Sequence, residues 1–276
     1  MIRLLLLLVL GFALPGRGED GIDLSRPVSE SVAPDRLYWN FDDGPRNPVF
    51  SGCVVDHSPS HYHGRLYPGD FNAEPTWTAG RFGSALYLEG AAMPYRDRNG
   101  TLRVRNNPKV VWRLVDTPEA WEVDRLNLDN TSFTAGLWIR VDRSREGESQ
   151  SITLMSRGQP QEPGRWGFYL SKDAGARWSL RFNRLASRLR TEAFNDGAWH
   201  HVALAVDAPG KEVTFWLDGE TLGDPVPMPE PLPPPEDEGR AGILSVGENL
   251  IGAIDDLFVT SGLYHFTAFS PEPSKP

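Results

Sequence analysis

The stretch that most constrains the fold is residues 196–219, which reads DGAWHHVALAVDAPGKEVTFWLDG. Apolar side chains alternate with small or polar ones along residues 199–207 and again along residues 212–217, which is the two-residue period of β-strands. Pro209-Gly210 supplies a turn between the two runs, and Asp218-Gly219 supplies a second turn after them. Neither face of the first run is strongly polar. The segment therefore predicts a β-hairpin covered on both sides, as in a β-sandwich.

This hairpin resembles the laminin-G-like branch of the concanavalin A-like lectin/glucanase superfamily, whose members carry a Trp-His-His-Val-Ala strand followed by an apolar strand ending in Asp-Gly. Five other blocks fall in the order of that branch: YWNFDDG (38–44), DHSPSHYHG (56–64), AGRFGSALYLEG (79–90), FTAGLWIRV (133–141) and IGAIDDLFV (251–259). The resemblance implies an all-β fold, a two-sheet antiparallel jelly-roll sandwich, over residues 36–268.

The rest of the chain divides into short segments. Residues 1–18 hold Arg3, an apolar run and small residues, the pattern of a secretory signal peptide. The apolar run is shorter than the roughly 20 residues that a membrane-spanning helix needs. We expect a flexible leader at residues 19–35, a disordered tail at residues 269–276, and a bacterial-type protein that is secreted or periplasmic, with no membrane span.

Charge and cysteine content narrow the partners and the sources of stability. The formal net charge is -9, which argues against nucleic acid and anionic membranes and is compatible with neutral glycans or cations. Cys53 is the single cysteine of the sequence. Because it has no partner, no intramolecular disulfide can form, and stability has to come from burial, hydrogen bonds or a bound ion.

Two acidic pairs form the first candidate site. Asp42 and Asp43 lie near the first predicted strand, and Asp255 and Asp256 lie in the last one. The terminal strands of a jelly roll come together, so these carboxylates can meet, and clustered aspartates with nearby carbonyls suit the six to eight oxygen ligands of Ca²⁺. Many members of the resembled branch hold calcium in this region. We expect a structural calcium ion here; the alternative is that the aspartates serve as turn residues and backbone contacts.

Histidines offer a weaker metal hypothesis. His57, His61 and His63 lie within seven residues and could bind zinc, but their spacing is irregular and a structural or solvent-facing role is preferred. His200 and His201 are adjacent on a strand and point to opposite faces, so they cannot share one ion. We expect one of them to be buried and hydrogen-bonded.

A catalytic site of the hydrolase type is not evident. Laminarinase-type relatives carry Glu-x-Asp-x-x-Glu on one strand, and the nearest match here, residues 122–127, ends in Asn127 instead of glutamate. The acid/base of a retaining pair is therefore missing. The chain is predicted not to be an enzyme.

Tryptophans are the remaining candidates for contact with a ligand. Flat rings stack on the apolar faces of sugars, and the candidate rings are Trp112, Trp121, Trp138, Trp166 and Trp216. Trp138 and Trp216 lie on the faces of their strands opposite to the apolar set, where packing within the framework is the competing role. Trp112, Trp121 and Trp166 lie in less regular stretches and are expected to be the more exposed.

Together these features predict an exported, non-catalytic lectin-like module that binds a carbohydrate or glycoconjugate, with a structural calcium ion. Two alternatives stay open: a protein-interaction or structural module of the cell envelope with an exposed apolar patch, and a glycoside hydrolase with an unrecognised site. The fold alone does not decide among them.

Overall fold

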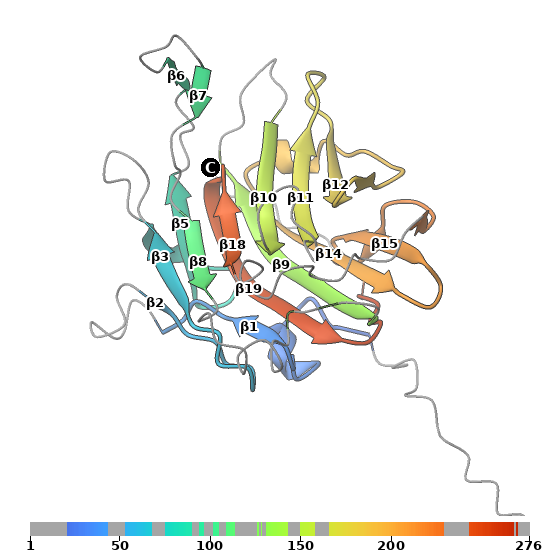
Figure 1. Cartoon of the computed structure of the whole chain (residues 1–276). Helices are drawn as coiled ribbons and strands as arrows, with labels where there is room; N and C mark the ends of the chain where they lie inside the picture. Colours follow the sequence, from blue (N-terminus) through green and yellow to red (C-terminus); the bar gives the residue numbers. More distant parts are fainter. Residues whose placement is uncertain are drawn as a thin grey trace, which may run out of the picture.

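The computed structural model (Figure 1) describes residues 21–43, 53–67, 75–89, 94–96, 102–104, 109–113, 126, 128, 131–142, 150–157, 166–228, 243–267 and 269. The predicted signal peptide, Trp121 and the predicted tail after Phe269 lie outside these residues. The same holds for residues 122–125 and 127 of the hydrolase-like stretch and for the side chain of Trp112. Among the described residues, no helix has both the length and the apolar character needed to cross a bilayer.

Two antiparallel sheets form the body of the described structure, and Figure 1 shows them as two layers. The nine-stranded sheet contains, in spatial order, β16 (Glu220–Thr221), β15 (Glu212–Leu217), β14 (Trp199–Asp207), β9 (Phe133–Val141), β19 (Ile251–Ser261), β5 (Ser84–Glu89) and β4 (Thr76–Ala79), with β1 (Leu37–Trp39) paired to β19 and β17 (Val226–Pro227) paired to β15.

The eight-stranded sheet contains, in spatial order, β13 (Leu185–Ala186), β12 (Trp178–Phe182), β11 (Trp166–Lys172), β10 (Gln150–Arg157), β18 (Ile243–Glu248), β8 (Lys109–Arg113), β3 (Gly64–Tyr67) and β2 (Cys53–Val54). A separate hairpin pairs β6 (Pro94–Arg96) with β7 (Leu102–Val104), and the described helices are the 3₁₀ turns η1 (Val28–Glu30) and η3 (Ala193–Asn195). The predicted all-β, two-sheet antiparallel sandwich is confirmed.

The hairpin predicted from residues 196–219 is present with the expected register. β14 ends at Asp207 and β15 begins at Glu212, and these two residues are directly opposite each other in the ladder. Val202, Leu204 and Val206 point between the sheets, as the alternation predicts. Ala203 points to the outer face of the nine-stranded sheet.

The main core lies between the two sheets. Alternate residues of β9, β14, β15 and β19 meet alternate residues of β10, β11, β12 and β18, and all are almost inaccessible to water. Each large apolar side chain buried this way contributes about 1.5–3 kcal/mol.

The outer face of the nine-stranded sheet is covered by the two ends of the described chain. An N-terminal segment (residues 21–32) and a C-terminal segment (residues 262–267) pair through an isolated parallel bridge between Ile22 and Phe266. Both side chains pack onto the outer face with Trp138 and Phe258. The prediction of a flexible leader at residues 19–35 is therefore wrong for residues 21–32, because their apolar side chains fill an otherwise exposed sheet surface.

Candidate functional site

The predicted acidic site lies where β1 meets β19. Leu37 pairs with Val259 and Trp39 with Leu257, so the first and last strands of the sandwich adjoin as expected. This pairing brings Asp42, just after β1, close enough to Asp255 and Asp256 to interact electrostatically with both. Three of the four predicted carboxylates, those of Asp42, Asp255 and Asp256, therefore lie at one junction.

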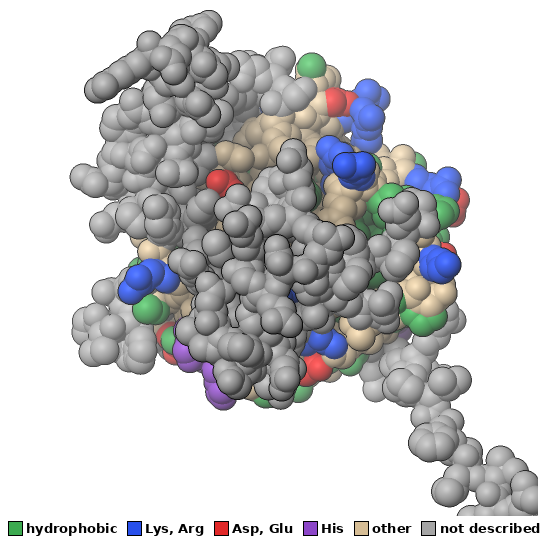
Figure 2. Space-filling model, in the orientation of Figure 1, with side chains coloured by type: hydrophobic (Ala, Val, Ile, Leu, Met, Phe, Trp, Pro, Cys, Tyr) green, Lys and Arg blue, Asp and Glu red, His purple; other side chains and the backbone are tan. Residues whose placement is uncertain are grey.

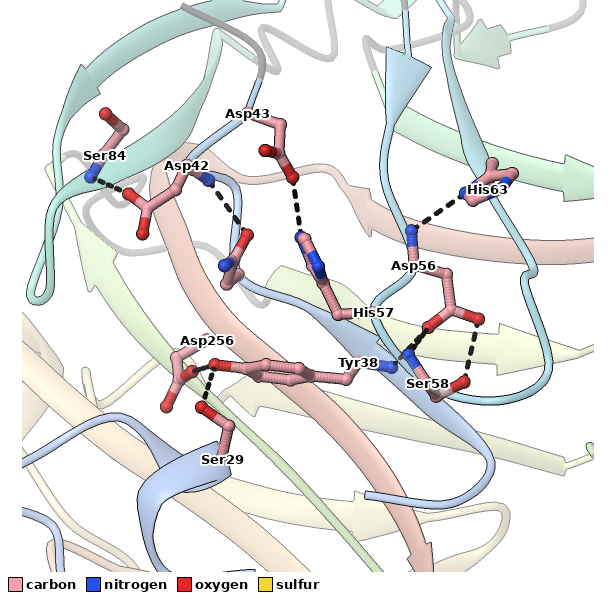
Figure 3. Close-up of polar contacts among 11 residues, drawn as sticks. Ser29, Tyr38, Asp42, Asp43, Asp56, His57, Ser58, His63, Ser84 and Asp256 are labelled. Carbon is pink, nitrogen blue, oxygen red and sulfur yellow. Dashed lines mark hydrogen bonds and ion pairs between the residues drawn. The ribbon is translucent and has the colours of Figure 1, made fainter. Parts of the chain in front are cut away.

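Backbone donors hold Asp42 and Asp255 under the turn between β4 and β5. The Asp42 carboxylate accepts a hydrogen bond from the backbone N–H of Ser84 at 2.7 Å (Figure 3). Asp255 accepts one from the N–H of Phe82 at 2.9 Å and another from that of Asp256 at 2.7 Å. Gly83 has a φ of 68° and leaves no room for a Cβ beside Asp42. The turn is therefore shaped around the two carboxylates.

Asp256 ties the N-terminal segment to the sheet. Its carboxylate accepts hydrogen bonds from the Val28 N–H at 2.8 Å and from the Tyr38 hydroxyl at 2.7 Å, and the Tyr38 oxygen in turn accepts from the Ser29 hydroxyl at 3.1 Å (Figure 3). Asp256 has a φ of 48° and lies at an irregularity in the pairing of β19 with β9, the pattern of a β-bulge. The bulge lets two adjacent aspartates both enter buried networks.

Burial raises the pKa values in this junction. The pKa of Asp255 is raised to about 8 by burial, with the charges of Asp256 and Asp42 adding to the effect. Burial also raises the pKa of Asp256 to about 6. The pKa of the Tyr38 hydroxyl rises for the same reason and because Asp256 faces it. The junction is an acidic, desolvated cluster held mainly by neutral donors.

The junction does not form a ready-made carboxylate cage for a metal. Asp43, the fourth predicted ligand, turns away and pairs with His57 at 2.6 Å (Figure 3). In the described part of the chain, no group of three or more His, Cys, Asp or Glu side chains is arranged to hold a metal ion. Any cation here would need carbonyl or water oxygens in addition to Asp42, Asp255 and Asp256.

The histidine loop is organised by Asp56 instead of by a metal. Asp56 is buried and accepts hydrogen bonds from the N–H groups of Tyr38, Ser58 and Tyr62 and from the Ser58 hydroxyl, at 2.6–2.9 Å. The backbone N–H of Asp56 donates to His63 Nδ1 at 3.0 Å (Figure 3). His63 and His57 thus have separate partners, which does not support the zinc alternative.

His200 and His201 are both buried, on opposite faces of β14. His200 Nδ1 bonds to the Asp218 carboxylate at 2.7 Å and Nε2 bonds to Asp196 at 3.2 Å. Asp218 also accepts the backbone N–H of His201 at 2.8 Å. The expectation of one buried, hydrogen-bonded histidine is confirmed by His200. His201 lies among aromatic rings, and its Nδ1 has no hydrogen-bond partner in the described structure.

Burial removes two of the predicted tryptophans from contact with a ligand. Trp166 begins β11, is 1% exposed, and donates its indole N–H to the Leu126 carbonyl; the expectation that it is exposed is wrong because its strand faces the main core. Trp138 is also 1% exposed, under Phe82, Phe269 and the guanidinium of Arg81. It serves the framework of the outer face, which was the competing role.

Trp216 is the predicted tryptophan that reaches a cavity. A pocket of about 290 Å³ lies on the outer face, and its lining residues are Ala205, Asp207, Glu212, Thr214, Trp216, Leu263, Tyr264 and His265. Ala205 of β14 and Thr214 of β15 have short side chains, which leaves the surface hollow between the larger lining residues. Trp216 is half-buried and its Nε1–H is fully buried, so the part that faces solvent is apolar ring surface.

The wall opposite the strands is the C-terminal segment, and its backbone is fixed at several points. The Tyr264 N–H donates to the Thr134 hydroxyl at 3.0 Å, and the His265 carbonyl accepts the Ile22 N–H at 2.9 Å. Phe266, next along, packs edge-on against Trp216 with ring centroids 5.5 Å apart. The pocket is thus framed by the hairpin and the C-terminal segment.

Sequence reasoning missed most of this pocket. Asp207 and Glu212 flank the Pro-Gly turn and share the outward face with Trp216, a pattern that was visible in the alternation. Tyr264 and His265 were not predictable, because nothing in the sequence says that residues 262–267 fold back over β14 and β15.

Comparison with known proteins supports the fold assignment. The family model described as "Concanavalin A-like lectin/glucanases superfamily" matches residues 117–262, more than half of the chain. No curated protein matched the sequence.

Among solved structures, a Trypanosoma rangeli sialidase in complex with 2,3-difluorosialic acid aligns with a TM-score of 0.50 and 13% identity, covering 83% of this chain and 30% of that chain. A structure titled for cell entry of botulinum neurotoxin type C through two ganglioside molecules aligns with a TM-score of 0.50 and 12% identity, covering 83% and 48%. The chain thus corresponds to less than half the length of either protein. At these identities the likeness concerns the fold alone.

Proposed function

Because the chain belongs to the concanavalin A-like lectin/glucanase superfamily, we propose that it is an exported, non-catalytic module that binds a carbohydrate or glycoconjugate in the pocket on the outer face of the nine-stranded sheet. Membership of the superfamily accounts for the fold, and the pocket is the feature that favours carbohydrate binding over catalysis. Export rests on the signal-peptide pattern of residues 1–18.

The observation that carries the proposal is the composition of the pocket. Trp216 and Tyr264 offer ring surface on which the apolar face of a sugar can stack, while Asp207, Glu212 and Thr214 offer oxygens for its hydroxyls. A volume of about 290 Å³ suits one sugar unit at the end or side of a longer glycan. Rigid walls favour affinity, because little side-chain freedom is lost on binding.

Filling the pocket tests the assignment. Thr214→Phe on β15 is expected to abolish binding on a glycan array and to insoluble polysaccharides, because the new ring occupies the pocket. Thr78→Phe is the matched control: Thr78 is a half-buried threonine of β4, at the opposite edge of the same sheet, and its change is expected to leave binding intact. A wild-type protein that binds no glycan on either assay would overturn the proposal.

A structural calcium ion at the acidic junction is part of the proposal. Asp42, Asp255 and Asp256 lie close enough to interact, and each carboxylate oxygen that accepts one hydrogen bond keeps a further lone pair for a cation. The missing ligands would be backbone carbonyls and water. In this role the ion would neutralise the junction and join the N-terminal segment to the sheet, with no part in ligand chemistry.

Thermal unfolding with and without calcium tests the ion separately. Calcium at about 100 times its dissociation constant is expected to stabilise the fold by about 2.7 kcal/mol, seen as a higher Tm than in chelator. Magnesium serves as the control cation, because it demands stricter octahedral geometry. Identical melting curves in calcium and chelator would remove the ion from the proposal and leave the sugar pocket untouched.

The described surface gives less support to a protein-interaction module. Leu189, 56% exposed, is the one exposed large hydrophobic side chain among the described residues. A lone exposed leucine is ordinary for a surface, whereas docking sites for proteins are usually contiguous apolar patches.

A further inference from the structure

The charge of the pocket points to a more specific ligand than a neutral sugar. Asp207 and Glu212 occupy opposing positions of the β14–β15 ladder, and both belong to the pocket lining. Neither forms an ion pair with a Lys or Arg among the described residues. The lining contains no Lys or Arg, and its one basic side chain is His265. The pocket therefore carries two negative charges beside aromatic surface.

This arrangement is unfavourable in the free protein. Like charges directly opposite each other on neighbouring strands destabilise a hairpin, and Asp207 and Glu212 stand at the last ladder position before the turn, where the sequence could accept a neutral residue. Asp207 Oδ1 accepts the Gly210 N–H at 3.0 Å, a role that an asparagine oxygen would fill equally well. The turn therefore needs an oxygen acceptor at position 207 but does not explain why Asp207, opposite Glu212, is charged.

A cation in the pocket would offset this repulsion. A protonated amine between the two carboxylates gains charge-assisted hydrogen bonds, and the ring faces of Trp216 and Tyr264 attract positive charge through their quadrupoles. The same rings stack on the carbon framework of a sugar. One ligand type, a sugar that bears a protonated amine, satisfies both halves of the pocket.

We propose that the pocket recognises an amino sugar with a free, protonated amine, such as a glucosaminyl unit, in preference to its N-acetylated or hydroxylated counterpart. This inference rests on the proposed carbohydrate-binding function and specifies its ligand class. The carboxylates of Asp207 and Glu212 favour the positively charged amine. The short side chains of Ala205 and Thr214 leave room for the sugar ring, and Trp216 and Tyr264 pack against that ring.

The test compares glucosamine oligosaccharides with N-acetylglucosamine oligosaccharides of equal length, by titration calorimetry at low and high salt. The free-amine oligomer is expected to bind about five- to tenfold more tightly at low salt, and the difference is expected to shrink as salt screens the charges. The variant Asp207→Asn/Glu212→Gln is expected to lose that preference while its Tm stays equal to or above that of the wild type. A purely structural role would lower the Tm.

Glu220→Gln is the matched control, because Glu220 is an exposed glutamate of neighbouring β16 outside the pocket; it is expected to keep the preference. Equal binding of both oligomers, abolished by Thr214→Phe, would overturn the amino-sugar inference and leave the proposed function standing. Absence of binding to every glycan would overturn both. A preference that survives Asp207→Asn/Glu212→Gln would place the amine elsewhere and would also overturn the inference.

Discussion

At the residue scale, the sequence signature HH…DG (His200, His201, Asp218 and Gly219) stabilises the pairing of two strands. Asp218 bonds the ring of His200 and the backbone N–H of His201 through its two oxygens, and the Asp218 N–H returns to the His201 carbonyl at 2.9 Å. One aspartate therefore joins the end of β15 to the start of β14. This explains why the motif predicts the fold well and says little about the ligand.

The two histidines are expected to give opposite pH dependences. Burial lowers the pKa of His201 from 6.5 to about 3, so below pH 6.5 the unfolded chain binds a proton that the native state does not. This lowers the free energy of unfolding by about 1.4 kcal/mol for each pH unit between about 6.5 and 3. His201→Phe, which suits its aromatic surroundings, is expected to be more stable than the wild type at pH 5. The measurement is the free energy of unfolding in urea at pH 5 and at pH 7. An equal fall from pH 7 to pH 5 in both proteins would contradict this.

His200 is expected to behave in the opposite sense. Burial alone would lower its pKa, but the hydrogen bonds and charges of Asp218 and Asp196 outweigh that effect and raise it above 6.5. The stability that the pairing adds is therefore fully present below pH 6.5 and is lost as the pH rises through the native pKa. His200→Gln should lose more stability at pH 6 than at pH 9, measured by urea unfolding. A loss that is constant with pH would mean that His200 is neutral in the native state.

Replacing Asp56 should lower the free energy of unfolding by an unusually large amount for so small a side chain. It is 2% exposed and satisfies three backbone N–H groups and one hydroxyl. Asp56→Ala leaves these buried donors without partners, and we expect the free energy of unfolding to fall by about 3 kcal/mol or more. Asp142→Ala is the control, because that carboxylate bonds to Arg140 at an exposed site. A fall of less than about 1 kcal/mol for Asp56→Ala would mean that water replaces the carboxylate.

At the element scale, the strands were predictable and the segments that cover them were not. Period-two alternation identified β9, β14 and β15 and assigned Trp138 to the outer face, because a residue and its second neighbour must share one side of a sheet. The N-terminal segment lacks such a period, so its docking through Ile22, Leu24 and Val28 was missed. Residues 262–267 lack such a period too, and they supply Tyr264 to the pocket, which is why the sequence revealed Trp216 but not Tyr264.

The edge of the eight-stranded sheet carries an arginine cluster despite the acidic charge of the chain. Arg184 and Arg188 flank the short edge strand β13 and are exposed. Figure 2 shows Lys and Arg side chains on the part of the molecular surface where Figure 1 places β12 and β15. Short strands and charged side chains prevent edges from pairing with other chains. We infer that these arginines keep the edge free of other chains.

Removing the two charges tests this interpretation. Arg184→Val/Arg188→Val is expected to change the free energy of unfolding by no more than about 0.5 kcal/mol but to increase concentration-dependent association in light scattering. Arg26→Val, at an exposed position just before η1, removes a surface charge away from that edge and should not promote association. Equal scattering from all three proteins would show that the edge needs no charge.

At the scale of the whole molecule, the terminal segments decide what the sandwich can do. They cover Trp138, Phe258 and Ala203, so the centre of the outer face is packed apolar surface. Among the described residues of this face, the pocket at the β14–β15 edge stays open, with about 290 Å³ of space. A hydrolase that cleaves a polysaccharide needs subsites on both sides of the bond and two carboxyl groups at a set separation. A pocket sized for one sugar unit suits capture of a glycan better than its cleavage.

On the proposed function, we therefore expect no hydrolysis of a bound glycan. Asp207 and Glu212 are the two carboxylates of the pocket, and both are half-exposed at the end of a hairpin. Release of reducing ends from bound oligosaccharide should equal the background and be identical in wild type and Asp207→Asn/Glu212→Gln. Release above background that either substitution abolishes would instead identify the pair as catalytic. In that event the same two carboxylates, with the same aromatic walls, would define a hydrolase in place of a lectin.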